Sequence, residues 1–379
     1  MADSPPQAAG GASPASRVSG NRRSGARGGG GPCFPPDDGG HAVKVLVTGA
    51  AGFIGFHLAC LLLDEGAEVV GLDSHNDYYD PRLKAAREAV LSERPGYVAV
   101  RGKVEQPGLL ADLFRTHRPD IVVHLAAQAG VRHSIDNPRA YAEANLAGTF
   151  EVLEAARLQP PVHLLMASSS SVYGANQRMP YRETDQVDHP LSFYAATKKA
   201  NETMAHSHAH IHGLAITMFR FFTVYGPWGR PDMAPHLFTS ALFEDRPIRV
   251  FNHGRMRRDF TYVADLVRGI RRLMDCPPGR GDDPVCEGDS LSPVAPWRGV
   301  NIGNGQPVEL MDFIAALEDA AGRKARLDMQ PMQQGDVPAT WADAELLRAL
   351  TGDAPRTDIA EGTARYVEWY RDYYGVDRN

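Results

Sequence analysis

Short apolar runs and longer amphipathic segments alternate along the chain from about residue 43 to residue 224. The short runs are rich in β-branched residues and predict strands buried in a parallel sheet, and the longer segments predict helices that cover it. The predicted strands cover residues 43–47, 68–73, 97–100, 120–127, 162–167 and 215–221. The predicted helices cover residues 53–65, 141–158 and 193–212. This alternation is typical of an α/β protein with a doubly wound parallel sheet.

Beyond the last of these strands the pattern changes, because proline and glycine become frequent. Residues 276–298 predict a loop rich in Pro, Gly and Asp, and helical patterns return at 308–321 and 358–374. We therefore predict a larger domain formed mainly by residues 42–224 and a smaller C-terminal α/β domain formed mainly by residues 225–379, with some late segments returning to the larger domain. The smaller domain is expected over the carboxyl edge of the sheet, where open α/β folds bind ligands.

The beginning of the chain differs from the rest, since residues 1–41 are rich in Gly, Ala, Ser, Pro and Arg. Such a segment buries too little apolar surface to offset its ordering entropy, so we predict a disordered tail. Its Arg and Ser content also resembles a transit peptide, although Gly and Pro disfavour an amphipathic helix. It lacks the apolar core of a signal peptide, and no run of about 18 apolar residues predicts a membrane span.

The 379 residues carry a formal net charge of −6. This balance disfavours a general electrostatic surface for nucleic acid, and an anionic substrate would need locally placed cations. The absence of paired cysteine spacing favours a reducing compartment and a cytoplasmic location. The cysteines are Cys33, Cys60, Cys276 and Cys286.

A glycine-rich turn joins the first predicted strand to the first predicted helix. Gly49, Gly52 and Gly55 permit a tight turn, close approach of the backbone to a pyrophosphate, and close packing of the helix on the strand. The helix would direct its N-terminus at the phosphates. Asp73 ends the second strand, where its carboxylate can accept a hydrogen bond from a ribose hydroxyl and repel a 2′-phosphate. These residues predict a Rossmann-type site for NAD rather than NADP; the alternative is a glycine-rich turn without a ligand.

Tyr194 and Lys198 lie four residues apart near the start of a predicted helix, so they share one face. A phenol is a weak base at neutral pH, but a nearby ammonium and the positive nicotinamide ring lower its pKa. Tyr194 can then take a proton from a sugar hydroxyl. The serines at 168–171 follow the fifth strand, where a hydroxyl can share that proton. Without the glycine turn, the pair would indicate only a surface helix and the serines only a polar turn.

Together these features resemble the extended short-chain dehydrogenase/reductases that act on nucleotide sugars, and longer motifs resemble the UDP-glucuronate 4-epimerases among them. The motifs are NDYYD (76–80), YAATKKANE (194–202), RFFTVYGPWGRPDM (220–233), RDFTY (258–262), NIGN (301–304) and PMQQGDV (331–337). The resemblance covers residues 43–375 apart from the predicted loop at 276–298.

The resemblance implies a reaction at C4 of UDP-glucuronate. Tyr194 would deprotonate the C4 hydroxyl while NAD takes the C4 hydride, with Lys198 and Ser169 as the other catalytic residues. The 4-keto sugar would turn over in the pocket, and return of hydride to the opposite face would give UDP-galacturonate. NAD is regenerated in each turnover and is therefore expected to stay bound.

The serine run distinguishes this reaction from two related ones. Related dehydratases and the uronate decarboxylase carry acids in the run, whereas this chain has Ser169, Ser170 and Ser171. Because no carboxyl group is present there to protonate a leaving hydroxyl or an enolate, epimerisation is favoured. The 4-keto uronate is a β-keto acid. Hydrogen bonds from Ser170, Ser171 and Thr223 are expected to hold its carboxylate out of the alignment that releases carbon dioxide.

Other site residues follow from the resemblance. Arg258 is expected to meet the diphosphate, and Asp336 is expected to accept from the uridine ribose. Arg132 and Arg230 are candidates for the uronate or the phosphates, although an arginine in either loop would also be an ordinary surface cation. Further cofactor contacts are expected from Phe53, Ile54, Val104, Leu125, Ala126 and Ala127.

Two positions depart from the related enzymes. Many relatives place an acid after the third strand to meet the adenine, whereas this chain has Arg-Gly-Lys-Val at 101–104, so a backbone contact is expected instead. Relatives that act on uncharged sugars often have Arg near the position of Gln333. The glutamine here leaves more of the phosphate binding to Arg258.

Four histidines on the helix predicted at 193–212 have the i, i+4 spacing of metal ligands. They are His206, His208, His210 and His212. No Cys or carboxylate nearby in the sequence completes a site, so we predict no metal and interpret the cluster as a solvated or dimer-interface face. This helix pairs subunits in many relatives, and a homodimer is expected by resemblance.

Two alternatives remain open at this point. The nearest enzymatic alternative is a UDP-glucose 4-epimerase or another nucleotide-sugar epimerase. A protein of a different class would sense NAD without catalysis, but such proteins usually lose the Tyr/Lys pair that this chain retains.

Overall fold

Seven parallel strands form one sheet in the computed structural model, which describes residues 42–333 and 336–376. Their order is β10-β6-β5-β4-β1-β2-β3. They are β1 (Lys44–Thr48), β2 (Glu68–Asp73), β3 (Tyr97–Arg101), β4 (Ile121–His124), β5 (His163–Ala167), β6 (Ile216–Phe221) and β10 (Trp297–Ile302). The predicted α/β class and parallel sheet are confirmed. The tail predicted at 1–41 lies outside the described residues.

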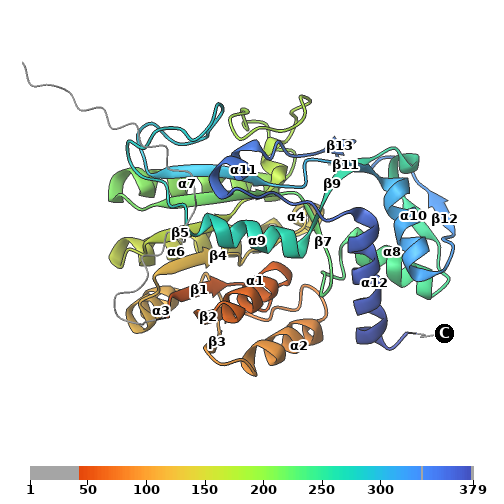
Figure 1. Ribbon diagram of the computed structural model, residues 1–379, viewed down its shortest axis with the longest axis horizontal. Coiled ribbons are helices and arrows are strands. Elements are labelled where there is room, and N and C mark those ends of the chain that lie inside the picture. Colours follow the sequence, from red (N-terminus) through yellow and green to blue (C-terminus); the bar gives the residue numbers. More distant parts are fainter. Residues whose placement is uncertain (1–41, 334–335, 377–379) are drawn as a thin grey trace, which may run out of the picture.

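Helices cover both faces of this sheet (Figure 1). Successive strand residues point to opposite faces, so Val45 and Val47 join one apolar cluster and Leu46 joins another. The first cluster includes residues of α1 (Phe53–Asp64), α9 (Val263–Leu273) and α11 (Glu345–Thr351). The second includes residues of α3 (Leu109–His117), α6 (Gly148–Leu158) and α7 (Phe193–His212).

The order of the strands reverses next to β1. β2 and β3 lie on one side of β1, while β4, β5 and β6 lie on the other. Connections that leave β1 and β4 therefore diverge, and a crevice opens at the carboxyl ends of these two strands. This is the position at which doubly wound folds bind ligands.

The later part of the chain forms smaller sheets and a third apolar cluster. β9 (Arg257–Tyr262) pairs with three short strands, which are β7 (Thr223–Tyr225), β11 (Pro307–Glu309) and β13 (Ala339–Thr340). β8 (Ile248–Val250) pairs with β12 (Leu327–Met329). The helices of this part are α8 (Ala234–Phe243), α10 (Leu310–Ala321) and α12 (Ile359–Tyr374). Figure 1 shows α8, α10 and β12 gathered at one end of the molecule with α12 beside them.

Some late segments return to the large sheet. β10 pairs with β6 at its edge, and α9 packs against α1 (Figure 1). The strand predicted at 120–127 ends at His124, because the following residues turn along the crevice. The helix predicted at 141–158 consists of three consecutive pieces, which are α5 (Pro138–Tyr141), the π-helical segment η1 (Ala142–Ala147) and α6.

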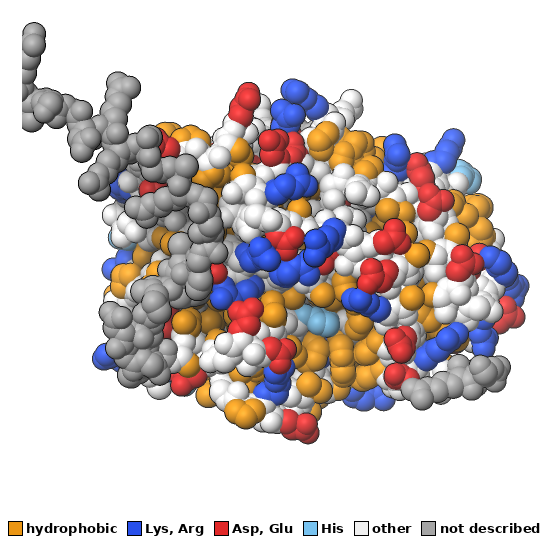
Figure 2. All heavy atoms as spheres, in the orientation of Figure 1, with side chains coloured by type: hydrophobic (Ala, Val, Ile, Leu, Met, Phe, Trp, Pro, Cys, Tyr) orange, Lys and Arg blue, Asp and Glu red, His pale blue; other side chains and the backbone are white. Residues whose placement is uncertain are grey.

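The sequence did not predict α2 (Pro81–Ser92), whose inner face buries Lys84 and Arg87 among its apolar side chains. Those two cations interrupt the apolar stripe by which a surface helix is predicted. The remaining short elements are α4 (His133–Asp136) and the 3₁₀ segments η2 (Ser170–Tyr173) and η3 (Phe251–Gly254). Within the described residues, no helix has both the length and the apolar character needed to cross a membrane. Figure 2 shows Lys and Arg side chains lying among Asp and Glu side chains across one face.

Candidate active site

A cavity of about 680 Å³ occupies the crevice at the carboxyl ends of the strands. It brings together nearly all of the predicted site residues. Those that line it are Gly49, Gly52, Phe53, Ile54, Gly55, Asp73, Val104, Leu125, Ala126, Ala127, Ser169, Ser170, Ser171, Tyr194, Lys198, Thr223, Arg230, Arg258 and Asp336. Arg132 does not line the cavity. Its guanidinium forms a 3.1 Å ion pair with Asp336, which does line it.

The glycine turn leaves room beside the backbone that no other residue type would leave. Gly49 has φ +75°, and a Cβ there would lie 2.9 Å from the backbone nitrogen of Ala126. A Cβ on Gly55 would overlap the carbonyl oxygen of Gly49. α1 begins at Phe53 without a side-chain cap, so its first N–H groups remain available to an anion. This cradle fits the pyrophosphate of a dinucleotide.

Asp73 is held at the edge of this cradle. Its two carboxylate oxygens accept from the backbone N–H groups of Ala51, at 3.1 Å, and His75, at 2.8 Å. The side chain is therefore fixed beside the glycine turn while it lines the cavity. A fixed carboxylate there can accept from a ribose hydroxyl and disfavours a 2′-phosphate, as the sequence predicted.

Tyr194 and Lys198 both face the cavity from the first turns of α7. Burial raises the pKa of Tyr194, whereas a hydrogen bond with Ser169 and the positive charge of Arg230 act in the opposite direction. The Lys198 ammonium donates to the carbonyl oxygen of Ala167 at 2.9 Å. Burial lowers the pKa of Lys198 to about 8, and the charge of Glu202 partly offsets this effect. The phenol and the ammonium thus lie in one desolvated corner of the site.

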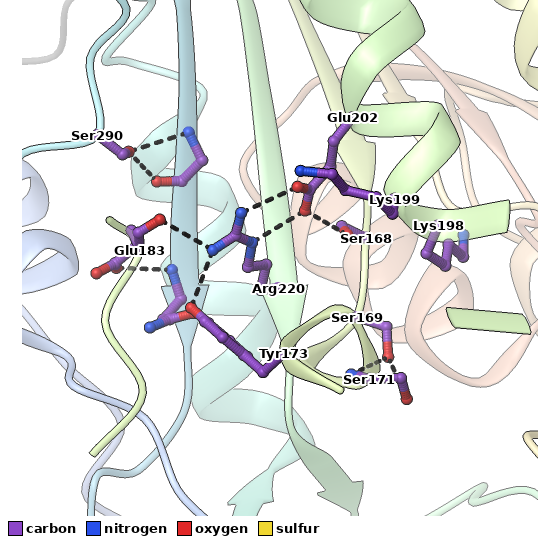
Figure 3. Close-up of polar contacts among 12 residues, drawn as sticks. Ser168, Ser169, Ser171, Tyr173, Glu183, Lys198, Lys199, Glu202, Arg220 and Ser290 are labelled. Atoms are coloured by element: carbon purple, nitrogen blue, oxygen red, sulfur yellow. Dashed lines mark hydrogen bonds and ion pairs between the residues drawn. The ribbon is translucent and has the colours of Figure 1, made fainter. Parts of the chain in front are cut away.

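The serine run divides into two parts (Figure 3). Ser168 also lines the cavity, but its hydroxyl donates to the buried Glu202 carboxylate at 2.6 Å. The Ser169 hydroxyl instead donates to the Ser171 hydroxyl at 3.1 Å and accepts from the Ser171 backbone N–H. Ser169 also hydrogen-bonds with Tyr194, whereas the Ser168 hydroxyl belongs to a buried network.

That network centres on an ion pair that the sequence analysis missed. Arg220 of β6 donates to both carboxylate oxygens of Glu202, at 2.9 Å each, and both side chains are 4% exposed. Arg220 also donates to the Tyr173 hydroxyl and to the Glu183 carbonyl oxygen (Figure 3). The sequence feature that could have indicated this ion pair is an arginine inside the mostly apolar strand ITMFRF. The pair joins α7 and the serine run to the sheet.

We expect the substitution Arg220→Met to lower the free energy of unfolding by about 3–5 kcal/mol, because it leaves the Glu202 carboxylate buried without its cation. The control Arg157→Met breaks a part-exposed pair with Glu154 and should cost less than about 1 kcal/mol. Urea unfolding followed by circular dichroism measures both values. A change as small in Arg220→Met as in Arg157→Met would contradict this assignment.

Two arginine side chains bring positive charge to the cavity. The Arg230 guanidinium donates to both Asp232 oxygens, at 3.0 and 2.5 Å, and lies 5.8 Å from the Tyr78 ring centre. Arg258 donates to the carbonyl oxygens of Val337, at 2.8 Å, and Pro338, at 3.2 Å. Both cations are held by protein groups while they line the cavity, so they are placed to meet an anionic ligand.

A family model described as the NAD dependent epimerase/dehydratase family matches residues 45–282. The chain belongs to this family. This match confirms the predicted resemblance. The sequence motifs had indicated several residues that line the cavity, namely the glycine turn, Asp73, Tyr194 and Lys198.

Individual members of the epimerase/dehydratase family match nearly the whole described chain. A probable UDP-glucuronate 4-epimerase of Rhizobium meliloti is 51% identical over 334 residues, which are 88% of this chain and 98% of the relative. UDP-glucuronate 4-epimerase 4 of Arabidopsis thaliana is 44% identical over 89% of this chain and 77% of the relative. The crystal structure of a Bacillus cereus UDP-glucuronic acid 4-epimerase with UDP-glucuronic acid and NAD matches at a TM-score of 0.78 and 30% identity, over 88% of this chain and 100% of the other.

Further residues that the sequence analysis did not assign to the site also line the cavity, and several of them carry polar or charged side chains. Among them are Asn76, Tyr78, Tyr79, Lys84 and Glu105. The sequence showed no acid at 101–104, but Glu105 directly follows that segment and lines the same cavity. Asn76 and the two tyrosines belong to the NDYYD motif, which carried the family resemblance without indicating contact with the site.

The α7 histidines in this epimerase/dehydratase chain each contact a different group. His206 bonds to the Ser292 hydroxyl at 2.8 Å, His208 to Glu154 at 3.3 Å, and His210 to the Val294 carbonyl oxygen at 2.8 Å. No group of three or more His, Cys, Asp or Glu side chains within residues 42–333 and 336–376 is arranged to hold a metal. The cluster anchors the loop before β10 and part of α6 to α7.

Proposed function

We propose that the protein is an NAD-dependent UDP-glucuronate 4-epimerase that interconverts UDP-glucuronate and UDP-galacturonate. The observation that carries this proposal is one cavity that unites the glycine cradle, Tyr194 and an acid-free serine run. The assignment agrees with the names of relatives that are 51% and 44% identical to the chain. It also agrees with the similar Bacillus cereus structure, which contains both UDP-glucuronic acid and NAD.

We assign the two ends of the cavity to the two ligands. NAD would lie against the segment mainly formed by residues 42–224, and the UDP-sugar between that segment and the segment mainly formed by residues 225–379. The proposed NAD contacts are Gly49, Gly52, Phe53, Ile54, Gly55, Asp73, Val104, Leu125, Ala126, Ala127 and Lys198. The proposed UDP-sugar contacts are Arg132, Ser169, Ser170, Ser171, Tyr194, Thr223, Arg230, Arg258 and Asp336.

In the proposed reaction, the side chains of the protein transfer the proton of the C4 hydroxyl and orient the sugar. Bound NAD supplies reversible acceptance of a hydride from C4. Tyr194 takes the proton of the C4 hydroxyl as the C4–O bond becomes a ketone, and returns it to the same oxygen after the ring has turned over. Ser169 shares that proton through its hydrogen bond with Tyr194. Burial raises the pKa of Tyr194, and the charge of Arg230 partly offsets that rise and so favours the phenolate.

Incubation of the purified protein with UDP-glucuronate, and separately with UDP-glucose, tests the proposal. Chromatographic separation of the epimers should show UDP-galacturonate from the first substrate and little or no UDP-galactose from the second. Turnover of UDP-glucose in preference would instead assign the enzyme to uncharged sugars. No turnover of either would overturn the epimerase proposal and favour an NAD-sensing protein.

Protection of the 4-keto intermediate against loss of its carboxylate gives a second test. Ser171→Ala and Thr223→Val each remove a hydroxyl that is placed to hold the carboxylate out of alignment with the ketone. One lost hydrogen bond to a charged group corresponds to about a 10- to 100-fold increase in the decarboxylated fraction. Carbon dioxide released per epimerisation event measures that fraction. Ser240→Ala, which removes a half-buried hydroxyl outside the cavity lining, serves as the control, and no release by either site variant would contradict the assigned role.

We propose that the protein is a homodimer assembled through α6 and α7. These helices pack together and expose large apolar side chains to solvent. The side chains and their exposed fractions are Phe150 (48%), Leu158 (64%), Phe193 (41%) and Ile211 (67%). Sedimentation equilibrium should give twice the chain mass of 41.3 kDa, and the Ile211→Asp variant should shift the mass toward one chain. A wild-type monomer at every concentration would contradict the proposal.

We also propose a cytoplasmic location. Cys60 and Cys286 are free thiols, which is the usual state of cysteines in a reducing compartment.

A further inference from the structure

Arg87, on the inner face of α2, is fully buried with 0% of its surface exposed. A buried arginine is ordinarily paired with a carboxylate, because removing its charge from water is costly. Arg87 makes no ion pair with any carboxylate in the described part of the chain. All three of its hydrogen-bond acceptors are neutral oxygens, and they belong to three separate segments.

The three acceptors connect the two halves of the site. One guanidinium nitrogen donates to the Ala51 carbonyl oxygen, inside the glycine turn, at 3.0 Å. The same nitrogen donates to the Tyr79 hydroxyl at 2.9 Å, and the second nitrogen donates to the Trp228 carbonyl oxygen at 2.5 Å. A single planar cation therefore ties the cofactor cradle to the loop that precedes Arg230.

That loop depends on such ties for its conformation. Trp228 has φ +60°, which a bulky side chain rarely adopts without support from its surroundings. A second tie comes from α1, where the His57 ring bonds to the Pro227 carbonyl oxygen at 2.8 Å. Burial lowers the pKa of His57 to about 4, so the ring is neutral near pH 7 and donates to that oxygen. Phe56 adds a ring contact with Trp228 at 5.2 Å.

Arg230 follows two residues later and lines the cavity. Its partner Asp232 also accepts from the Tyr78 hydroxyl at 3.2 Å. Tyr78 adjoins Tyr79, which is itself bonded to Arg87. Arg87 thus supports Arg230 along two routes, one through the Trp228 backbone and one through the tyrosine pair, without lining the cavity itself.

We propose that Arg87 is a positioning residue that fixes the 226–230 loop to the glycine turn, so that cofactor retention and Arg230-dependent substrate affinity both depend on it. The proposal rests on the proposed function only where substrate affinity is concerned. The planar guanidinium of Arg87 is essential to the role, because the ammonium of a lysine at this position could not donate to three acceptors held in these directions.

The Arg87→Gln and Arg87→Lys variants test this role, with Arg94→Gln as the matched control. Like Arg87, Arg94 donates to a backbone carbonyl oxygen and does not line the cavity, but its partners Cys60, at 3.2 Å, and Asp64 lie in the C-terminal half of α1, away from the glycine turn. NAD content per chain is measured after denaturing the purified holoenzyme, and KM and kcat are measured with UDP-glucuronate. We expect Arg87→Gln to lose most of its NAD and to raise KM about tenfold or more, with a smaller fall in kcat at saturating NAD and substrate, because Arg230 also acts on Tyr194. Arg87→Lys should fall between Arg87→Gln and the wild type.

Wild-type NAD content and KM in Arg87→Gln, with only a lower melting temperature, would overturn the proposal. If Arg87→Gln does not fold, Arg87→Lys decides the question in the same way: a raised KM with reduced NAD supports the role, and wild-type values of both overturn it. The two proposals fail separately. A wild-type protein that does not turn over UDP-glucuronate contradicts the proposed function, whereas the NAD content of the Arg87 variants still tests the positioning role.

Discussion

Replacing Tyr194 with Phe should lower kcat for UDP-glucuronate epimerisation by about 10²–10⁴-fold, the usual contribution of a positioned general base. The substitution removes only the hydroxyl that exchanges the C4 proton and keeps the ring packed between α7 and the cavity. NAD content should therefore remain at the wild-type level, and KM should change little. Initial rates measured by separation of the two UDP-uronates, together with the NAD content of the same preparation, provide the comparison.

Tyr374→Phe is the matched control for this prediction, because Tyr374 is 40% exposed at the end of α12 and does not line the cavity. Activity of the control should equal that of the wild type. A Tyr194→Phe variant that retains more than about a tenth of wild-type kcat would assign the proton transfer to another group. A Tyr→Phe variant of the similar Bacillus cereus enzyme, crystallised with a 4-fluoro substrate analogue and NAD, offers a structural precedent for such a test.

Replacing Gly55 with Ala should remove most of the bound NAD. The added Cβ overlaps the carbonyl oxygen of Gly49, so the glycine turn must shift. Overpacking of this kind costs about 1–3 kcal/mol. Because the strained turn is the one that holds the pyrophosphate, this cost corresponds to about a 10- to 100-fold loss in affinity for NAD. Titration of the variant with NAD, followed by protein fluorescence, measures the dissociation constant.

Gly269→Ala is the control, because a Cβ at that position of α9 would meet nothing closer than 3.6 Å. Alanine is the better helix former, so this control should bind NAD normally and unfold at the same or a higher temperature. Normal NAD affinity in Gly55→Ala would contradict the location of the cofactor.

Local signals allowed much of this site to be predicted from the sequence. The glycine turn, Asp73, Tyr194 and Lys198 each lie at the end of a strand or the start of a helix. Their positions at the carboxyl edge therefore follow once the strand and helix alternation is recognised. The serine run was predictable for the same reason, since it directly follows β5.

Partners that are distant in sequence could not be predicted in this way. Glu202 and Arg220 meet because α7 packs beside β6, and no local pattern specifies which carboxylate a buried arginine will find. Arg87 is a clearer case. Its acceptors include backbone carbonyl oxygens 36 and 141 residues away, and a carbonyl leaves no residue-specific signal in a sequence. The shape of the Trp228 loop, which these contacts maintain, was therefore also outside the reach of sequence patterns.

The most direct test of the proposed reaction uses UDP-glucuronate that carries deuterium at C4, in ordinary water. A hydride that leaves C4 and returns to C4 within the same site cannot exchange with solvent. We predict UDP-galacturonate that retains the deuterium at C4, identified by mass spectrometry and proton NMR. UDP-galacturonate that has lost the label would contradict the account, as would the absence of UDP-galacturonate.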